Sequence, residues 1–161
     1  MEKALHLYEE AVKLAAALKD RKREVAALNG IGLVYSGAGR PQKALAFYQQ
    51  ALPIERTVGD KATEANTLSN IGQVYSDTGE PQKALDYFQR SLPIRRAVGD
   101  KAGEATTLSN IGLVYSHTGQ PQKALDYYQK ALPLAQAAGD KAGEATILSS
   151  IDVITKAASK P

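Results

Sequence analysis

The sequence predicts an all-α protein, built as an α-solenoid of antiparallel helix hairpins. Two observations predict this fold. A sequence segment of about 40 residues recurs through the chain of 161 residues, most clearly in residues 41–80 and 81–120. Within each copy, apolar residues recur at helical spacing in two stretches, and short polar turns separate these stretches. A strict long period is typical of a stacked array in which each unit contacts mainly its neighbours.

The first helix of each copy can be delimited in residues 60–79. Asp60 can accept backbone hydrogen bonds as an N-cap, and Glu64 in the first turn suits the positive end of the helix dipole. Gly79 can adopt the left-handed conformation that ends a helix. These signals predict a helix over residues 61–77.

The second helix of each copy opens at a proline such as Pro81 and ends at a glycine such as Gly99. Pro53, Pro93 and Pro133 lie inside these second helices, but the apolar spacing continues past each of them. We therefore expect one bent helix in each case and not two. The expected helices are 2–18, 21–37, 41–58, 61–77, 81–98, 101–117, 121–138 and 141–158.

These helices are expected to form one array with an incomplete unit at each end. Asp152 and Thr155 stand where the other copies have glycine and tyrosine, so a second helix could not pack closely there. The expected units are a half repeat 1–20 (second helix only), repeats 21–60, 61–100 and 101–140, and a capping half repeat 141–161.

Within each period the spacing is Leu-x2-Ile-Gly-x2-Tyr-x8-Ala-x3-aromatic. In residues 61–100 the matching residues are Leu68, Ile71, Gly72, Tyr75, Ala84 and Phe88. The pattern resembles the tetratricopeptide repeat, and its longer period is similar to the repeats of kinesin light chains, of adaptors that bind GoLoco peptides and of bacterial signalling arrays. The resemblance implies a right-handed superhelix whose first helices line a concave groove that holds a partner peptide or helix. The usual late proline is absent here, since its position holds Arg56, Arg96 or Gln136.

Small residues are expected to set the spacing between the helices of a pair. We expect Gly32, Gly72 and Gly112 to let the partner helix approach closely. Their expected neighbours on that helix are Ala44, Ala84 and Ala124.

Residues on the opposite side of the first helices from the apolar face would line the groove. The candidates are Asn29, Leu33, Asn66, Ser69, Asn70, Gln73, Asp77, Thr106, Ser109, Asn110, Leu113 and His117. The family uses asparagine at the position of Asn70 and Asn110 to hold an extended backbone, because one amide both donates and accepts. Within the first helices, the second and third repeats differ at positions 66/106, 73/113 and 77/117 of this stripe and at 63/103 near the helix start. A binding face over a fixed scaffold would vary in this way, and so would an exposed face under drift; the asparagines would then be merely solvated.

The sequence offers no catalytic constellation. His6 and His117 occupy unrelated positions, there is no cysteine, and the recurrent aspartates have a sufficient role as caps. We therefore expect no catalytic residues, no cofactor and no metal site. The groove positions that match the chaperone-binding members of the family carry no Lys or Arg, so a clamp for an acidic C-terminus is not expected.

The charge pattern also narrows the partner classes. The net charge is +3, but the lysines recur at fixed repeat positions and fit solvated outer faces, so we expect no nucleic acid partner. No apolar run is long enough to cross a bilayer, so we expect no membrane partner and a cytoplasmic location.

The sequence thus predicts a non-catalytic scaffold that binds a partner protein or peptide in the groove. The alternative is a structural module that forms homo-oligomers through its exposed terminal helices. The dependence of solution mass on concentration distinguishes the two. A spacer or sensor role within a longer signalling chain is a third possibility.

Overall fold

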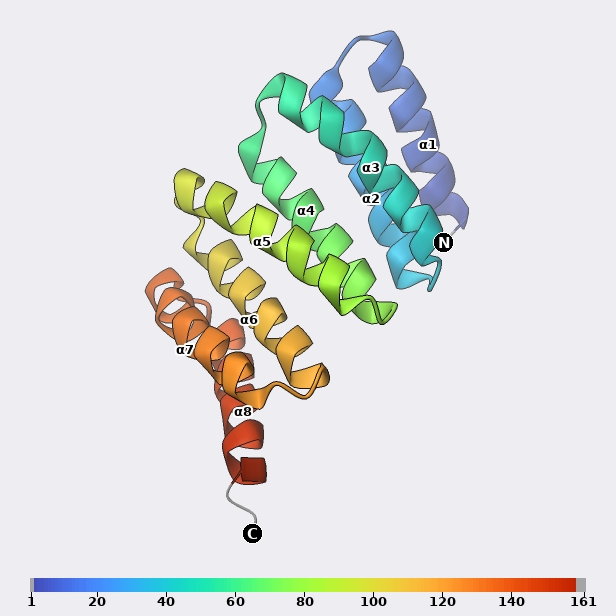
Figure 1. Cartoon of the computed structure of the whole chain (residues 1–161). Helices are drawn as coiled ribbons and strands as arrows, with labels where there is room; N and C mark the ends of the chain where they lie inside the picture. Colours follow the sequence, from blue (N-terminus) through green and yellow to red (C-terminus); the bar gives the residue numbers. More distant parts are fainter. Residues whose placement is uncertain (1, 159–161) are drawn as a thin grey trace.

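The computed structural model describes residues 2–158, which form α-helices joined by short turns (Figure 1). The helices are α1 (Glu2–Ala17), α2 (Arg21–Gly37), α3 (Pro41–Val58), α4 (Lys61–Asp77), α5 (Pro81–Val98), α6 (Lys101–His117), α7 (Pro121–Ala138) and α8 (Lys141–Ala158). The all-α prediction is confirmed, and the bounds match the expected ranges except that α1 ends one residue earlier, at Ala17. The outer limits expected for the array, residues 1 and 159–161, lie outside the described residues.

Local signals at the helix ends explain why the bounds agree. The side chain of Asp60 accepts a hydrogen bond from the backbone N–H of Thr63, and Asp20 and Asp100 cap α2 and α6 in the same way. The second helices end at glycines with positive φ, for example 72° at Gly99. Each of Pro53, Pro93 and Pro133 lies inside a single continuous helix, as expected.

The hairpins stack in chain order, with α1 and α8 at opposite ends of the array (Figure 1). The first helices form one layer: α2 contacts α4, α4 contacts α6, and α6 contacts α8. Within residues 2–158, no such contact joins α3, α5 and α7 to one another. Equivalent helices of neighbouring repeats in the described chain therefore contact each other only in the layer of first helices. This closer approach curves the array, with the first helices on its concave side.

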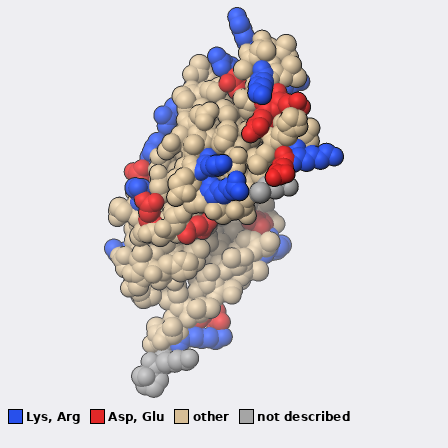
Figure 2. Space-filling model, turned by 90° about the vertical axis from the view of Figure 1, so that its right-hand side faces the viewer, with Lys and Arg blue, Asp and Glu red and all other residues tan. Residues whose placement is uncertain are grey.

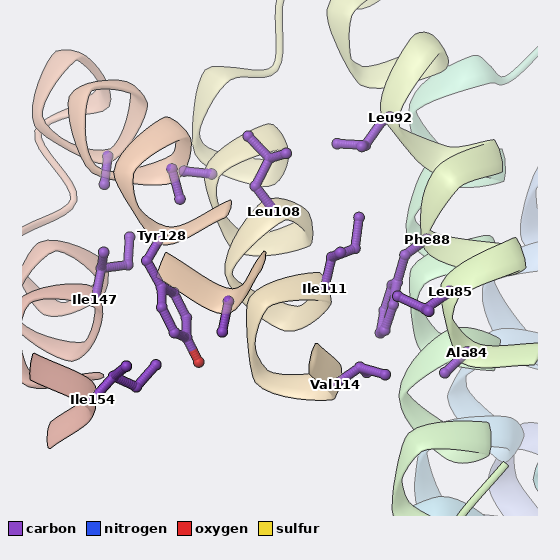
Figure 3. Packing of buried hydrophobic residues seen from close by; sticks show 14 residues of the cluster. Ala84, Leu85, Phe88, Leu92, Leu108, Ile111, Val114, Tyr128, Ile147 and Ile154 are labelled. Atoms are coloured by element: carbon purple, nitrogen blue, oxygen red, sulfur yellow. The ribbon is translucent and has the colours of Figure 1, made fainter. Parts of the chain in front are cut away.

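Aromatic rings from the second helices fill the space between neighbouring first helices. Phe88 of α5 is fully buried and points toward Ile111 and Val114 of α6 (Figure 3). Tyr128 of α7 is also buried and packs near Ile147 of α8 (Figure 3). The buried core therefore follows the array as two clusters, one from α2 to α4 and one from α5 to α8, and Tyr75 packs against both.

The same rings explain the glycines of the first helices. A Cβ atom on Gly72 would lie 2.8 Å from Cδ1 of Phe88, which is closer than side chains approach. Gly32 meets the ring of Tyr48 in the same way, and Gly112 meets that of Tyr128. The nearest neighbour of each glycine is thus an aromatic ring, a contact that the sequence analysis did not predict. Ala84 is nevertheless fully buried.

Each hairpin also carries a stacked aromatic pair beneath a lysine. Tyr75 stacks on Tyr87 with 5.6 Å between ring centroids, and Lys83 Nζ lies 5.0 Å from the centroid of Tyr75. The neighbouring hairpins repeat this arrangement, with Lys43 over Tyr35 and Lys123 over Tyr115. The recurrent lysines thus have a local role. On the face in Figure 2, basic and acidic side chains are interspersed.

Candidate functional site

Two cavities lie along the layer of first helices, where the sequence predicted a groove. A cavity of about 390 Å³ between α2 and α4 is lined by residues that include Asn29, Leu33, Asn66 and Asn70. The second cavity, of about 200 Å³, lies between α6 and α8, and Thr106, Ser109 and Asn110 line it. The structure therefore brings together seven of the twelve predicted groove residues at these two cavities.

The remaining candidates are placed differently. Gln73, Asp77 and Leu113 line neither cavity, and His117 borders a separate cavity of about 230 Å³ near the turn after α4. Ser69 lies beneath the groove, where its hydroxyl is 2.9 Å from that of Ser91.

Asn70 and Asn110 have the amides with the greatest freedom to bind a ligand. Both side chains are half-buried, and both lie at cavities. In the part of the chain that the structure describes, neither amide makes a hydrogen bond. Each therefore has both donor and acceptor capacity available to a partner.

Other predicted groove residues are already held by bonds within the chain. Asn29 Nδ2 donates to Glu55 Oε1 at 2.9 Å, and Asn29 Oδ1 accepts from Thr67 Oγ1 at 3.1 Å. Gln73 Nε2 donates to Asp77 Oδ1 at 2.7 Å. These amides are oriented by the protein itself, a property that the sequence pattern did not reveal.

Arg95 is the functional-site residue that the sequence interpretation missed. It comes from α5, a second helix, yet it borders the cavity between α2 and α4, and only 6% of its surface is exposed. Its Nη2 donates to Asn66 Oδ1 at 3.0 Å and to Ser69 Oγ at 3.2 Å. Its Nη1 donates to Asp100 Oδ2 at 2.5 Å. The groove positions that match the chaperone-binding members of the family carry no Lys or Arg, but Arg95 brings a cation to this cavity from a second helix.

The position of Arg95 varies between repeats although it is buried in each. Glu55 occupies it one repeat earlier, and Ala135 one repeat later. Both are fully buried. We call residues 55, 95 and 135 the floor positions, because each lies beneath the layer of first helices. Their side chains differ in charge from one repeat to the next.

Glu55 is a buried acid that links two first helices. Its Oε1 accepts from Asn29 of α2 and, at 2.6 Å, from Thr67 Oγ1 of α4, while its Oε2 has no partner in the described structure. Burial raises the pKa of Glu55 above its ordinary value, although the hydrogen bonds from Thr67 and Asn29 oppose this shift.

Glu55→Gln is expected to remove a pH dependence of stability. Since the folded pKa is raised, the contribution of Glu55 is most favourable below the ordinary pKa of 4.5 and is lost as the pH rises through the raised value. Glutamine retains an acceptor for Asn29 and Thr67 but cannot ionise. The stability of the wild type relative to the variant should therefore fall over a pH range that begins near the ordinary pKa of 4.5 and extends upward. Urea unfolding of both proteins across this range checks the prediction, which a constant difference would contradict.

The N-terminal end of the array exposes an apolar surface. Leu14 of α1 and Leu18 in the turn that follows it are 62% and 63% exposed, and they border a cavity of about 430 Å³ between α1 and α2. Here Tyr8 packs on Gly30. Gly30 is the residue that corresponds to Asn70 and Asn110 of the next two repeats. The glycine lets the tyrosine ring approach α2, because any Cβ at this position would meet the ring.

Residues 2–158 contain neither a metal-binding cluster nor a membrane-spanning helix. In that range no three His, Asp or Glu side chains gather closely enough to hold a metal ion. None of the helices described there is long and apolar enough to cross a membrane.

The family profile of the tetratricopeptide repeat matches residues 1–57 and 63–137. The chain belongs to the tetratricopeptide repeat (TPR) family. The resemblance seen in the sequence is thereby confirmed, as is the right-handed superhelical α-solenoid. TPR repeats generally mediate protein–protein interaction and are generally non-enzymatic scaffolds.

Several solved structures have a similar fold. RapI in its apo form superposes with a TM-score of 0.84 at 18% identity, over 93% of this chain and 42% of RapI. BtubC (BKLC) from P. vanneervenii superposes with a TM-score of 0.76 at 20% identity, over 99% of this chain and 75% of BtubC. A signal transduction ATPase with a tetratricopeptide repeat sensor from Pyrococcus horikoshii gives 0.76 at 23% identity, over 93% of this chain and 24% of that protein. At these identities the likeness shows the fold alone. A comparison with curated protein sequences finds no match.

Proposed function

We propose that this TPR array is a non-catalytic scaffold that binds a segment of a partner protein in its concave groove. One observation carries the proposal: Asn70 and Asn110 occupy equivalent positions in adjacent repeats, and both amides are unbonded within residues 2–158. An amide can donate to a peptide C=O and accept from its N–H, so the two residues would hold an extended or helical segment at two points.

Neighbouring side chains support the same surface. Leu33 and Leu113 lie on the same stripe of α2 and α6, and they are 55% and 36% exposed, so they can supply apolar contact. Arg95 accompanies Asn66 at the cavity between α2 and α4 and orients its amide. A partner would therefore meet a surface whose polar groups are largely ordered before binding, which lowers the entropic cost of association.

The double variant Asn70→Ala with Asn110→Ala is expected to weaken partner binding by about tenfold or more, because each lost hydrogen bond contributes roughly 0.5–1.5 kcal/mol. Helicity and melting temperature should remain close to those of the wild type, since neither amide bonds within the described chain. The partner can be retrieved with the wild-type protein from the source lysate, identified by mass spectrometry, and its Kd measured for both proteins.

The matched control is Gln89→Ala with Gln129→Ala. These two amides are exposed and also lie one repeat apart, but on the second helices α5 and α7. The control should bind as the wild type does. Equal affinity of the asparagine variant and the wild type would refute the groove assignment.

Self-association through the terminal helices remains a second proposal. The exposed leucines of α1 favour it. At the other end, Asp152 is exposed and binds Lys156 of the same helix. A charged pair at the position of the packing glycine is poorly suited to receive another helix, so the groove is the better supported interaction surface.

A further inference from the structure

The aspartates that cap the first helices all bind a backbone N–H through one carboxylate oxygen, but they differ in the partner of the other oxygen. In each, Oδ1 accepts a backbone N–H in the first turn of the helix. The other oxygen, Oδ2, is engaged by a different side chain in the first three copies. The partners of Asp20, Asp60 and Asp100 are Arg23 Nε at 3.3 Å, Thr63 Oγ1 at 2.9 Å and Arg95 Nη1 at 2.5 Å.

Asp140 departs from this series. Within residues 2–158, its Oδ2 has no hydrogen-bond or ion-pair partner. Asp140 lines the cavity of about 200 Å³ between α6 and α8.

The preceding repeat shows what such a site holds. The guanidinium of Arg95 bonds to Asp100 and to Ser69 Oγ, and its Nε donates to Ser91 Oγ at 3.2 Å. Gly103 is needed beside it, because a Cβ at this position would collide with Arg95 Nη1. Where the floor position is Glu55, the residue that corresponds to Gly103 is Thr63.

The next repeat has the residues equivalent to those around Arg95 but lacks the arginine itself. Asp140, Ser109 and Gly143 stand where Asp100, Ser69 and Gly103 stand one repeat earlier. They line the cavity together with Ala135, the floor residue in the place of Arg95. The atoms nearest to a Cβ on Gly143 would be those of the Asp140 carboxylate. The hydroxyl of Ser109, like Asp140 Oδ2, makes no hydrogen bond in the described chain.

The cavity also suits the aliphatic part of such a side chain. Ala105, Ala135 and Ile147 line it and are 2% exposed or less. The hydroxyls of Thr106 and Thr146 donate to carbonyl oxygens of their own helices, so they do not compete for Asp140. An apolar base below an anionic acceptor fits a long side chain with a cationic end.

We propose that the cavity between α6 and α8 binds the guanidinium group of an arginine side chain carried by the partner segment. Asp140 Oδ2 and Ser109 Oγ accept its hydrogen bonds, as Asp100 and Ser69 accept those of Arg95 inside the protein. The planar guanidinium can reach both acceptors at once, and this favours arginine over lysine. The proposal rests on the proposed function in that the cavity opens into the same groove, beside Asn110.

The direct test uses n-propylguanidinium chloride as the probe and the full chain labelled with ¹⁵N. The amide signal of Gly143 should shift and saturate as the probe is added, whereas n-propylammonium chloride at equal ionic strength should bind at least fivefold more weakly. Asp140→Asn keeps a capping side chain but removes the charge, and it should weaken probe binding at least tenfold. No saturable shift in the wild type, or equal binding by Asp140→Asn, would overturn the proposal.

A second variant fills the site from within. Ala131→Ser with Ala135→Arg copies Ser91 and Arg95 into the next repeat, where Asp140, Ser109 and Gly143 already match. It should fold as the wild type does and lose the probe-dependent shift of Gly143. Retained probe binding in this folded variant would contradict the assignment.

The two proposals fail separately. Probe titration involves neither the partner nor Asn70, so it tests the cavity even if the groove assignment is wrong. Once a partner is known, its affinity should fall at least tenfold with Ala131→Ser and Ala135→Arg. A partner whose affinity depends on Asn70 and Asn110 but not on this filled cavity would overturn the arginine site and leave the groove in place.

Discussion

Phe88→Ala is expected to lower the free energy of unfolding by about 3–5 kcal/mol, the usual loss for a large buried aromatic residue. The ring of Phe88 is fully buried, lies against Gly72 of α4 and points toward α6 (Figure 3). Removing it leaves a cavity where the second and third repeats meet. Because the units of a repeat array contact mainly their neighbours, weakening a central contact should also reduce the cooperativity of unfolding.

Urea unfolding followed by circular dichroism measures this effect, with attention to both midpoint and slope. Phe88→Tyr is the matched control, since Tyr48 and Tyr128 occupy the equivalent positions of the neighbouring repeats. We expect this control to stay within about 1 kcal/mol of the wild type. A loss below about 1 kcal/mol for the alanine variant would show that the ring does not join the repeats as the structure indicates.

Gly72→Leu is expected to destabilise the protein by about 1–3 kcal/mol through overpacking. Even the first added carbon, Cβ, would lie 2.8 Å from the ring of Phe88. The helix pair α4–α5 would have to separate, which would weaken contacts along the whole hairpin. Chemical denaturation at constant pH measures the loss.

The matched control for this variant is Gly37→Leu. Gly37 is the last residue of α2, and a Cβ there would meet nothing within 4 Å. Leucine at this site should be neutral or slightly stabilising, because it is a better helix former than glycine. In addition, Gly72→Leu combined with Phe88→Ala should cost less than the sum of the two single changes, because the missing ring makes room for the leucine. Strict additivity would contradict direct contact between the two residues.

The sequence allowed the helices to be predicted closely because their ends depend on local chemistry. Asp60 and Gly99 act on backbone atoms within a few residues of themselves, so their effect needs no knowledge of the tertiary structure. The apolar spacing likewise identified the buried face. The contact between Gly72 and the ring of Phe88 was not predicted, because it depends on how two helices rotate against each other.

Arg95 shows where reasoning along one helix at a time fails. Its role arises because α5 places it beneath α4 and beside the first turn of α6, three segments that no local pattern connects. A signal was nonetheless present in the sequence. Glu55 occurs with Thr63, and Arg95 occurs with Gly103, eight residues apart in both cases. Comparing such pairs between repeats would have indicated that the floor positions contact the following helix.

The floor positions also determine how stiff each step of the array is. Glu55 joins α2 to α4 through hydrogen bonds, and Arg95 joins α4 to the start of α6. Ala135 provides no such tie between α6 and α8. A bulky ligand that widens the concave side should therefore separate α6 from α8 more than it separates the other first helices. Bending of the superhelix would then be concentrated near its C-terminal end.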